Sequence, residues 1–189
     1  SDLFTFTAAL LTGSVDGEAG DDTFTGTGGS ISGALTDAMG TTTLNGTITA
    51  GSVNLTGDVV LGSSTVVLNT SGAITIGGTT NGTGGAPAET LPLNAGGGTI
   101  NVGAIYGAGG AASAAGLTDV TVTNAGTMNF NGPIAITGAL TQTNAATGTT
   151  TFANTVSVGS AALKGVAFAI NNSFASGGTT SITNSGTVT

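Results

Sequence analysis

The sequence repeats itself, and this internal repetition restricts the possible folds more than any other feature. Residues 40–57 (GTTTLNGTITAGSVNLTG) align without a gap onto 148–165 (GTTTFANTVSVGSAALKG), with nine of 18 positions identical. Residues 126–136 align onto 148–158 at an offset of 22, and 121–128 align onto 181–188 at an offset of 60. Repeats of about 20–30 residues are typical of stacked architectures, in which each unit packs only on its neighbours.

Each repeat contains short runs in which apolar and small polar residues alternate. Examples are Ala73-Ile74-Thr75-Ile76, Thr99-Ile100-Asn101-Val102 and Val120-Thr121-Val122-Thr123. A period of two places the apolar residues on one face of a β-strand and Thr, Asn or Ser on the other. Gly, Asn and Ser separate the runs, as in turns. No comparable run has the period of an amphipathic helix.

The sequence therefore predicts an all-β fold, a right-handed parallel β-helix (β-solenoid). Equivalent strands of successive coils would pair in parallel and their inward side chains would stack in ladders. The gapless alignment places Leu44 level with Phe152, and Ile48 level with Val156, in these ladders. A β-sandwich is the alternative, because it also contains many short strands, but it does not account for the repetition.

We interpret residues 1–189 as a single β-solenoid module. Residues 1–27 are expected to form an N-terminal strand followed by an acidic turn. Two segments break the rhythm of the repeats and are predicted to be loop excursions, the Gly-rich segment 77–90 and the Ala/Gly-rich segment 103–117. Protruding loops are where a solenoid usually keeps its binding specificity.

Composition agrees with thin stacked layers and narrows the possible functions. Hydrophobic residues make up 39% of the chain and aromatic residues 4%, so the apolar volume comes from small aliphatic side chains. The net charge is −8, and Lys164 is the one basic residue. Binding to nucleic acid or to anionic lipid is excluded, since both depend on clustered Lys and Arg. No segment has the roughly 18 consecutive apolar residues of a membrane span.

Three phrases of the sequence resemble the repeats of very large bacterial exoproteins. They are VDGEAGDDTFTGT (15–27), GDVVLGSSTVVLNTSGAITIGG (57–78) and GALTQTNAATGTTTFANTVSVGS (138–160). In style they are similar to the repeats of filamentous-haemagglutinin-like and autotransporter-type adhesins. The resemblance implies a parallel β-helix, export to the cell surface or the medium, and a role in adhesion, aggregation or matrix. It carries no catalytic motif.

The acidic residues cluster once, near the N-terminus. The segment Gly17–Thr25 fits the calcium-binding nonapeptide G-G-x-G-x-D-x-U-x, with glutamate in place of the second glycine. Carboxylate and carbonyl oxygens are the ligands that Ca²⁺ prefers. A complete site of this kind needs two stacked copies, and one is visible, so a solvated acidic turn is the alternative. The candidate calcium ligands are Asp16, Glu18, Asp21 and Asp22.

The chain has few residues that could catalyse a reaction, and we expect that it is not an enzyme. The chain has no His and no Cys, which excludes an imidazole base, a Ser-His-Asp triad and thiolate chemistry. A two-carboxylate glycosidase is the remaining arrangement, but four of the acids lie singly in the sequence: Asp37, Asp58, Glu89 and Asp119.

Threonine pairs suggest one further possibility. T-x-T occurs at Thr5/Thr7, Thr23/Thr25, Thr47/Thr49 and Thr121/Thr123. Stacked in flat ladders, such pairs would indicate an ice-binding face, whereas Thr is also simply a good outward residue of a strand. The pairs do not recur at one fixed spacing, which favours the second interpretation.

The sequence thus predicts a secreted or surface-exposed structural or adhesive repeat protein, an adhesin module or the subunit of a filament. The alternative is a calcium-dependent carbohydrate-binding or carbohydrate-acting β-helix. The segments 3–11 and 182–189 are strand-like without a polar cap. We therefore expect the partners to be other copies of the chain, stacked head to tail, or flanking repeats of a longer chain. A carbohydrate or another cell-surface ligand is a further expected partner.

Overall fold

The computed structural model describes residues 1–84, 88–107 and 116–189, without the side chains of 144–146. In these residues it contains strands and turns and no helix. The strands are β1 (Leu3–Phe6), β2 (Leu10–Leu11), β3 (Val15–Asp16), β4 (Asp22–Asp37), β5 (Thr41–Leu55), β6 (Asp58–Thr70), β7 (Ile74–Gly82), β8 (Glu89–Asn94), β9 (Thr99–Tyr106), β10 (Leu117–Asn124), β11 (Thr127–Phe130), β12 (Ile134–Ala135), β13 (Ala139–Phe152), β14 (Val156–Val158), β15 (Ser160–Ile170), β16 (Phe174–Ser176) and β17 (Thr180–Asn184).

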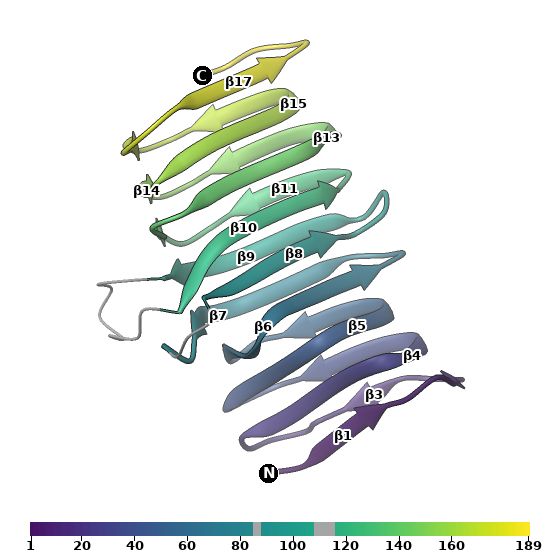
Figure 1. The fold of residues 1–189 in the computed structure, drawn as a ribbon. Coiled ribbons are helices and arrows are strands. Elements are labelled where there is room, and N and C mark those ends of the chain that lie inside the picture. The colour runs from purple at the N-terminus through teal and green to yellow at the C-terminus, as the bar shows by residue number, and fades with distance from the viewer. Residues whose placement is uncertain (85–87, 108–115) are drawn as a thin grey trace.

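The chain winds as a β-solenoid of about eight coils. In Figure 1 the near strands run from left to right, the far strands return from right to left, and the chain rises with each turn, so the coil is right-handed. The strands pair in parallel with their equivalents one coil away, as in β4 with β5 and β13 with β15. The predicted fold class is confirmed, and the β-sandwich is wrong.

Each coil has three faces, which we call A, B and C in chain order. In the second coil, β4 supplies all three: residues 22–25 on face A, 30–31 on face B and 34–37 on face C, with register shifts at the corners between them. In later coils some faces are separate strands, such as β14 on face A and β11 on face C, whereas β13 and β15 each supply faces B and C. The faces enclose a narrow interior, which the inward side chains fill.

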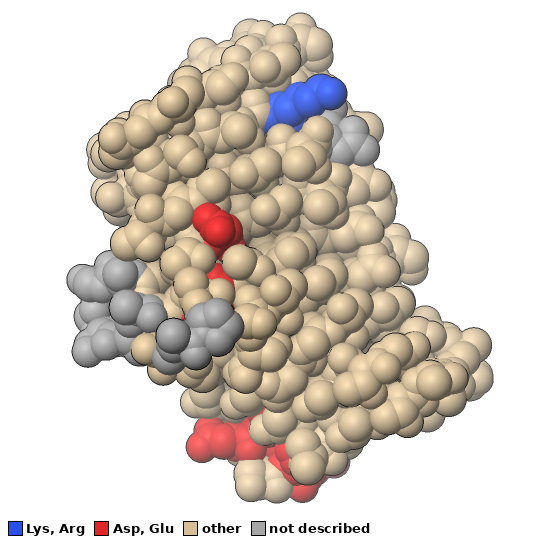
Figure 2. Space-filling model, in the orientation of Figure 1, with Lys and Arg blue, Asp and Glu red and all other residues tan. Residues whose placement is uncertain are grey.

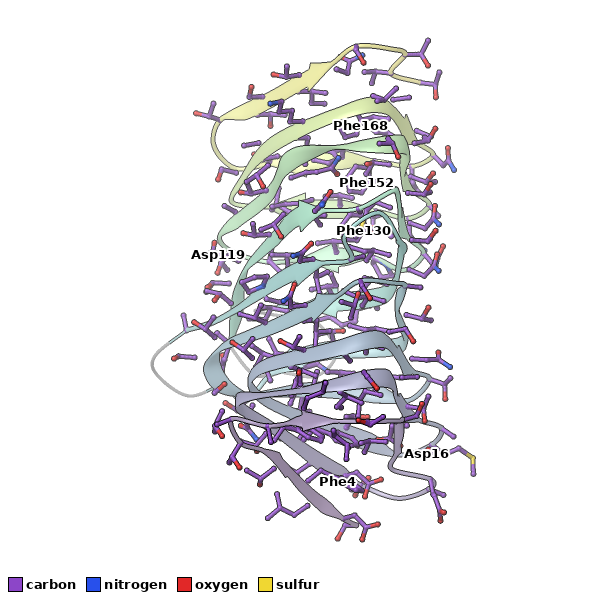
Figure 3. All side chains as sticks on the ribbon, turned by 90° about the vertical axis from the view of Figure 1, so that its right-hand side faces the viewer. Phe4, Asp16, Asp119, Phe130, Phe152 and Phe168 are labelled. Carbon is purple, nitrogen blue, oxygen red and sulfur yellow. The ribbon has the colours of Figure 1, made fainter. Side chains whose placement is uncertain are left out.

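The core consists of columns of side chains that run along the solenoid axis. One column on face C rises one coil at a time through Val15, Leu35, Val53, Ile74, Ile100, Met128, Thr150, Phe168 and Val188. All of these but the last are buried. Figure 3 shows Phe130, Phe152 and Phe168 above one another inside the coil. The spacing along this column varies from 18 to 28 residues, so the coils differ in length at their corners.

The prediction that Leu44, Ile48, Phe152 and Val156 face inward is confirmed, since all four are buried. The gapless alignment, however, does not match residues of the same face. Leu44 stacks between Phe24 and Leu61 on face A. Phe152 stacks between Phe130 and Ile170 on face C. Strands with the same alternation occur on all three faces, so the alignment of 40–57 onto 148–165 matches residues of one face with residues of another.

The two other alignments are correct in register. At the offset of 22, Phe130 pairs with Phe152 and Ile134 with Val156. At the offset of 60, Val122 reaches Ile182 in three steps, through Gln142 and Leu163. A spacing of 60 residues is therefore three coils.

Parts of both predicted loop excursions are strands. Residues 77–82 continue β7 and residues 89–90 begin β8. Likewise, residues 103–106 belong to β9. Residues 85–87 and 108–115, within the two predicted excursions, lie outside the described residues.

Candidate functional site: a buried acidic corner

The four predicted calcium ligands lie in the first turn of the solenoid and the corner that follows it, and they divide into exposed and buried side chains. Asp16, at the end of β3, Glu18 and Asp21 are exposed, whereas Asp22, the first residue of β4, is buried. Figure 3 places Asp16 on the outer surface near the N-terminal end. Among the described residues, no group of three or more acidic side chains is arranged to hold a metal ion. Calcium binding by these four residues stays a prediction.

Three acids, the exposed Asp21 and Asp58 and the half-buried Asp119, have structural partners in the neighbouring coil. Asp21 Oδ1 accepts a hydrogen bond from the backbone N–H of Thr41 at 2.9 Å. Asp58 Oδ1 does the same for Thr79 at 2.7 Å, and Asp119 Oδ1 for Ala139 at 2.6 Å. At these corners the strand ladder is interrupted, so the carboxylate satisfies an N–H that would otherwise have no partner. These acids join successive coils.

Three acids are different, because their side chains are buried. Glu89, the first residue of β8, accepts hydrogen bonds from the backbone N–H and the hydroxyl of Thr83 with Oε1, and its Oε2 is buried without a partner. The other two acids are close to each other. Asp22 and Asp37 are 1% and 2% exposed, and Asp37 is the last residue of β4. One oxygen of each is satisfied: Asp22 Oδ1 accepts the N–H of Asp2 at 2.5 Å, and Asp37 Oδ2 accepts the hydroxyl of Thr42 at 2.6 Å. The other oxygens, Asp22 Oδ2 and Asp37 Oδ1, are buried without a hydrogen-bond partner.

The two carboxylates lie beside each other at the corner between faces C and A. Thr42, which binds Asp37, stacks directly on Asp22 in the face A column. A Cβ atom added to Gly17, in the coil below, would lie 2.9 Å from Asp22 Oδ2 and 3.3 Å from Asp37 Cγ. A side chain at position 17 would therefore displace the Asp22 carboxylate and press on the ring of Phe24, whose Cζ lies 3.2 Å from the same point.

Other coils place mainly apolar residues at these two positions. The column that begins at Asp37 continues with Leu55, Ile76, Val102, Phe130, Phe152 and Ile170. The column that begins at Asp22 continues with Thr42, Val59, Thr80, Ile105, Ile134, Val156 and Phe174. The carboxylate pair is thus an exception to the pattern of the core, and burying it costs free energy.

This environment changes the acidity of Asp37. Burial raises the pKa of the Asp37 carboxyl above its ordinary value, and the negative charges of Asp22 and Asp16 raise it further. The hydrogen bond from Thr42 favours the ionised form and partly opposes this shift.

Sequence reasoning treated Asp37 as an isolated acid, which is wrong. Asp22 begins face A and Asp37 ends face C of the same coil. A coil closes on itself, so its first and last inward residues meet at one corner. The proximity of Asp22 and Asp37 can therefore be predicted once the coil boundaries are known, but the sequence pattern does not define those boundaries.

The described surface includes three open hollows. The largest, about 640 Å³, lies at the N-terminal end and is lined mainly by apolar residues, including Leu3, Phe4, Phe6 and Leu10. A second, of about 380 Å³, is lined by Ile31, Ala50 and Gly51 and by polar residues of three successive coils: Ser30, Ser32, Thr49, Asn69, Thr70 and Ser71. The third, of about 280 Å³, contains Lys164.

Charged groups are sparse over the visible surface. In Figure 2 the acidic atoms gather at the N-terminal end and near the middle of the molecule, and the single basic side chain lies toward the C-terminal end. Most of this face is uncharged. The part of the chain that the structure describes contains no helix that could cross a membrane.

The fold defines the chain as a β-solenoid, a class that includes the β-helical adhesins. Comparison with protein-family models, with curated proteins and with solved structures gives no match. Function must therefore be argued from the geometry of this chain.

Proposed function

We propose that this chain is a structural and adhesive module of an exported bacterial surface protein. The observation that carries the proposal is the column on face C, which continues from Val15 in the first coil to Val188 in the last. Such a column makes a stiff rod, because each coil is held by the coils on both sides. A stiff rod with flat, mostly uncharged faces suits a spacer or an adhesive surface.

The contacts of the acidic residues support a non-enzymatic role. Acids outside the acidic corner, such as Asp58 and Asp119, accept hydrogen bonds from the backbone of the next coil. The buried pair Asp22 and Asp37 has one oxygen each already bound and stands inside the coil rather than in an open cleft. A glycosidase needs two carboxyl groups that face a bound sugar.

We infer that the ends of the rod contact further coils, either of a longer chain or of a second copy. The first coil exposes Leu3, Leu10 and Leu11, which are 74%, 65% and 45% accessible. They border the apolar hollow at this end, and the strand edges there have backbone groups available for pairing. Another coil, stacked in parallel, would cover both the side chains and the edge.

Adhesion is tested by displaying residues 1–189 on a bacterium that does not adhere, and by measuring autoaggregation and attachment to host cells and to glycan-coated surfaces. We expect a gain of aggregation or attachment over the bacterium without the module. A variant that does not fold, Phe152→Asp, is the control for display alone. Release of reducing sugars from polysaccharide, or no gain in any binding assay, would contradict the proposal.

The alternative, a carbohydrate-binding solenoid, is supported by the hydroxyl-lined hollow. Its side chains carry no charge and come from three successive coils, so hydroxyl and amide groups repeat along it. This arrangement suits a neutral oligosaccharide. Replacing Thr49, in this hollow, by Val should weaken glycan binding, whereas Thr75→Val on face C should not. Equal binding by both variants would rule out this hollow as the site.

A further inference from the structure

No basic side chain of the described structure lies at the buried corner. Asp22 and Asp37 place two carboxylates within the core, and Asp16 adds a third at its edge. The single basic side chain, Lys164, is in β15, in a coil near the other end of the rod. A buried carboxylate is tolerated when it is neutralised or bound to a cation, so the corner needs a positive charge.

The geometry shows where that charge would lie. Asp22 Oδ2 and Asp37 Oδ1 are the two oxygens without partners, and both are buried. Both carboxyl groups lie against the same small space above Gly17. Asp37 is the last residue of β4 and stands fifteen positions after Asp22 in the sequence. It is not part of the acidic segment 16–22, and the closure of the coil brings it next to Asp22.

We propose that Asp22 and Asp37 bind one calcium ion at the corner of faces C and A. The ligands that the structure offers are the carboxylate oxygens and the hydroxyl of Thr42, an all-oxygen set that suits a hard cation. Ca²⁺ takes six to eight oxygens in a flexible geometry, so the proposed site requires water to complete the shell. The proposal does not depend on the adhesive function.

This site differs from the nonapeptide site that the sequence predicts. Glu18 and Asp21 are exposed, and Asp21 already accepts the N–H of Thr41. In the site proposed from the structure, Asp37 is a ligand in place of Glu18 and Asp21. The two hypotheses therefore predict different effects for the same set of substitutions.

The test is thermal unfolding and calorimetric titration with CaCl₂ near neutral pH, with EDTA and MgCl₂ as comparisons. A ligand that binds only the folded state stabilises it by mass action. We expect a binding stoichiometry of one, a rise in Tm that EDTA reverses, and a smaller rise with Mg²⁺, which demands stricter octahedral geometry.

The substitutions decide between the sites. Asp37→Asn and Asp22→Asn keep the shape of the side chain and remove its charge, so both should weaken calcium binding by at least tenfold. Glu18→Gln and Asp21→Asn should leave it unchanged. Without calcium, Asp37→Asn should be more stable than the native chain, because it removes a buried charge. This effect shows that the variant folds.

Three results would overturn the proposal. The first is a native chain whose Tm does not respond to calcium, which would leave a proton as the neutralising charge. The second is an Asp37→Asn variant that binds calcium as well as the native chain. The third is loss of binding in Glu18→Gln or Asp21→Asn, which would assign the ion to the exposed acidic turn.

Discussion

The rings of Phe130 and Phe152 stack one coil apart, with centroids 5.0 Å apart and planes within 3° of parallel. This separation is close to the spacing of neighbouring strands in a sheet, about 4.8 Å. Strand pairing and ring stacking therefore require the same rise per coil. The Phe152 ring also contacts Phe174 edge to face at 5.5 Å, so it links faces C and A inside the rod.

Replacing Phe152 by Asp should prevent folding. The side chain is fully buried, and a carboxylate there would have no partner between two apolar layers. Phe152→Leu is the matched control, because Leu55 occupies the same column. It should fold with a loss of about 1–3 kcal/mol. Circular dichroism and urea unfolding measure both. A Phe152→Asp variant as stable as the native chain would show that the column from Leu55 through Phe130 to Phe152 is wrongly assigned.

Glycines in the paired strands should be far less tolerant than a glycine in an open turn. A Cβ atom at Gly26 would lie 1.7 Å from the carbonyl oxygen of Thr47 in the next coil, whereas a Cβ at Gly97 would meet nothing within 4 Å. Gly26→Ala should therefore cost about 1–3 kcal/mol or more. Gly97→Ala should be neutral or stabilising by up to about 1 kcal/mol. Similar unfolding midpoints for the two variants would contradict the close approach of the coils.

Asp119 should contribute to the stability of the fold through its acceptor oxygen rather than through its charge. Its Oδ1 accepts the N–H of Ala139 at 2.6 Å in a partly buried corner. Asp119→Ala leaves that N–H without a partner and should cost about 1–2 kcal/mol. Asp119→Asn keeps an acceptor oxygen and should retain most of the stability. Urea unfolding compares the two, and the interpretation fails if the Asn variant loses as much as the Ala variant.

The stability of the calcium-free chain should depend on the charge of Asp37. The pKa of this carboxyl is raised in the folded state, so between the ordinary value of about 3.9 and the raised value the folded chain binds more protons than the unfolded chain. Stability is therefore highest at the acid end of that window and falls as the pH rises through the folded pKa.

Urea unfolding in EDTA at a series of pH values measures this effect, with Asp37→Asn as the reference. The native chain should lose stability relative to this variant as the pH rises from the acid range toward neutral. The opposite slope, a gain for the native chain relative to the variant, would show that Asp37 is better stabilised as an ion in the folded state. Added calcium should reduce the difference if the proposed site is correct.

The repeats and the alternation of residues were sufficient to predict the class of the fold. The period of two identified which side chains face inward, and Leu44, Ile48, Phe152 and Val156 are all buried. The offsets of 22 and 60 residues matched one and three coils. The direction of a side chain depends on strand geometry alone, and the repeat spacing depends on the pairing of equivalent residues in adjacent coils. Both can therefore be predicted from short stretches of sequence.

The tertiary structure alone decided which residues share a column and which acids meet. The distance between equivalent residues varies from 18 to 28 positions, because the corners differ in length and no strand pattern records that length. For this reason the gapless alignment matches Leu44 with Phe152, although the two residues stand on different faces. The sequence pattern also left Asp37 isolated, although closure of the coil buries that carboxyl beside Asp22.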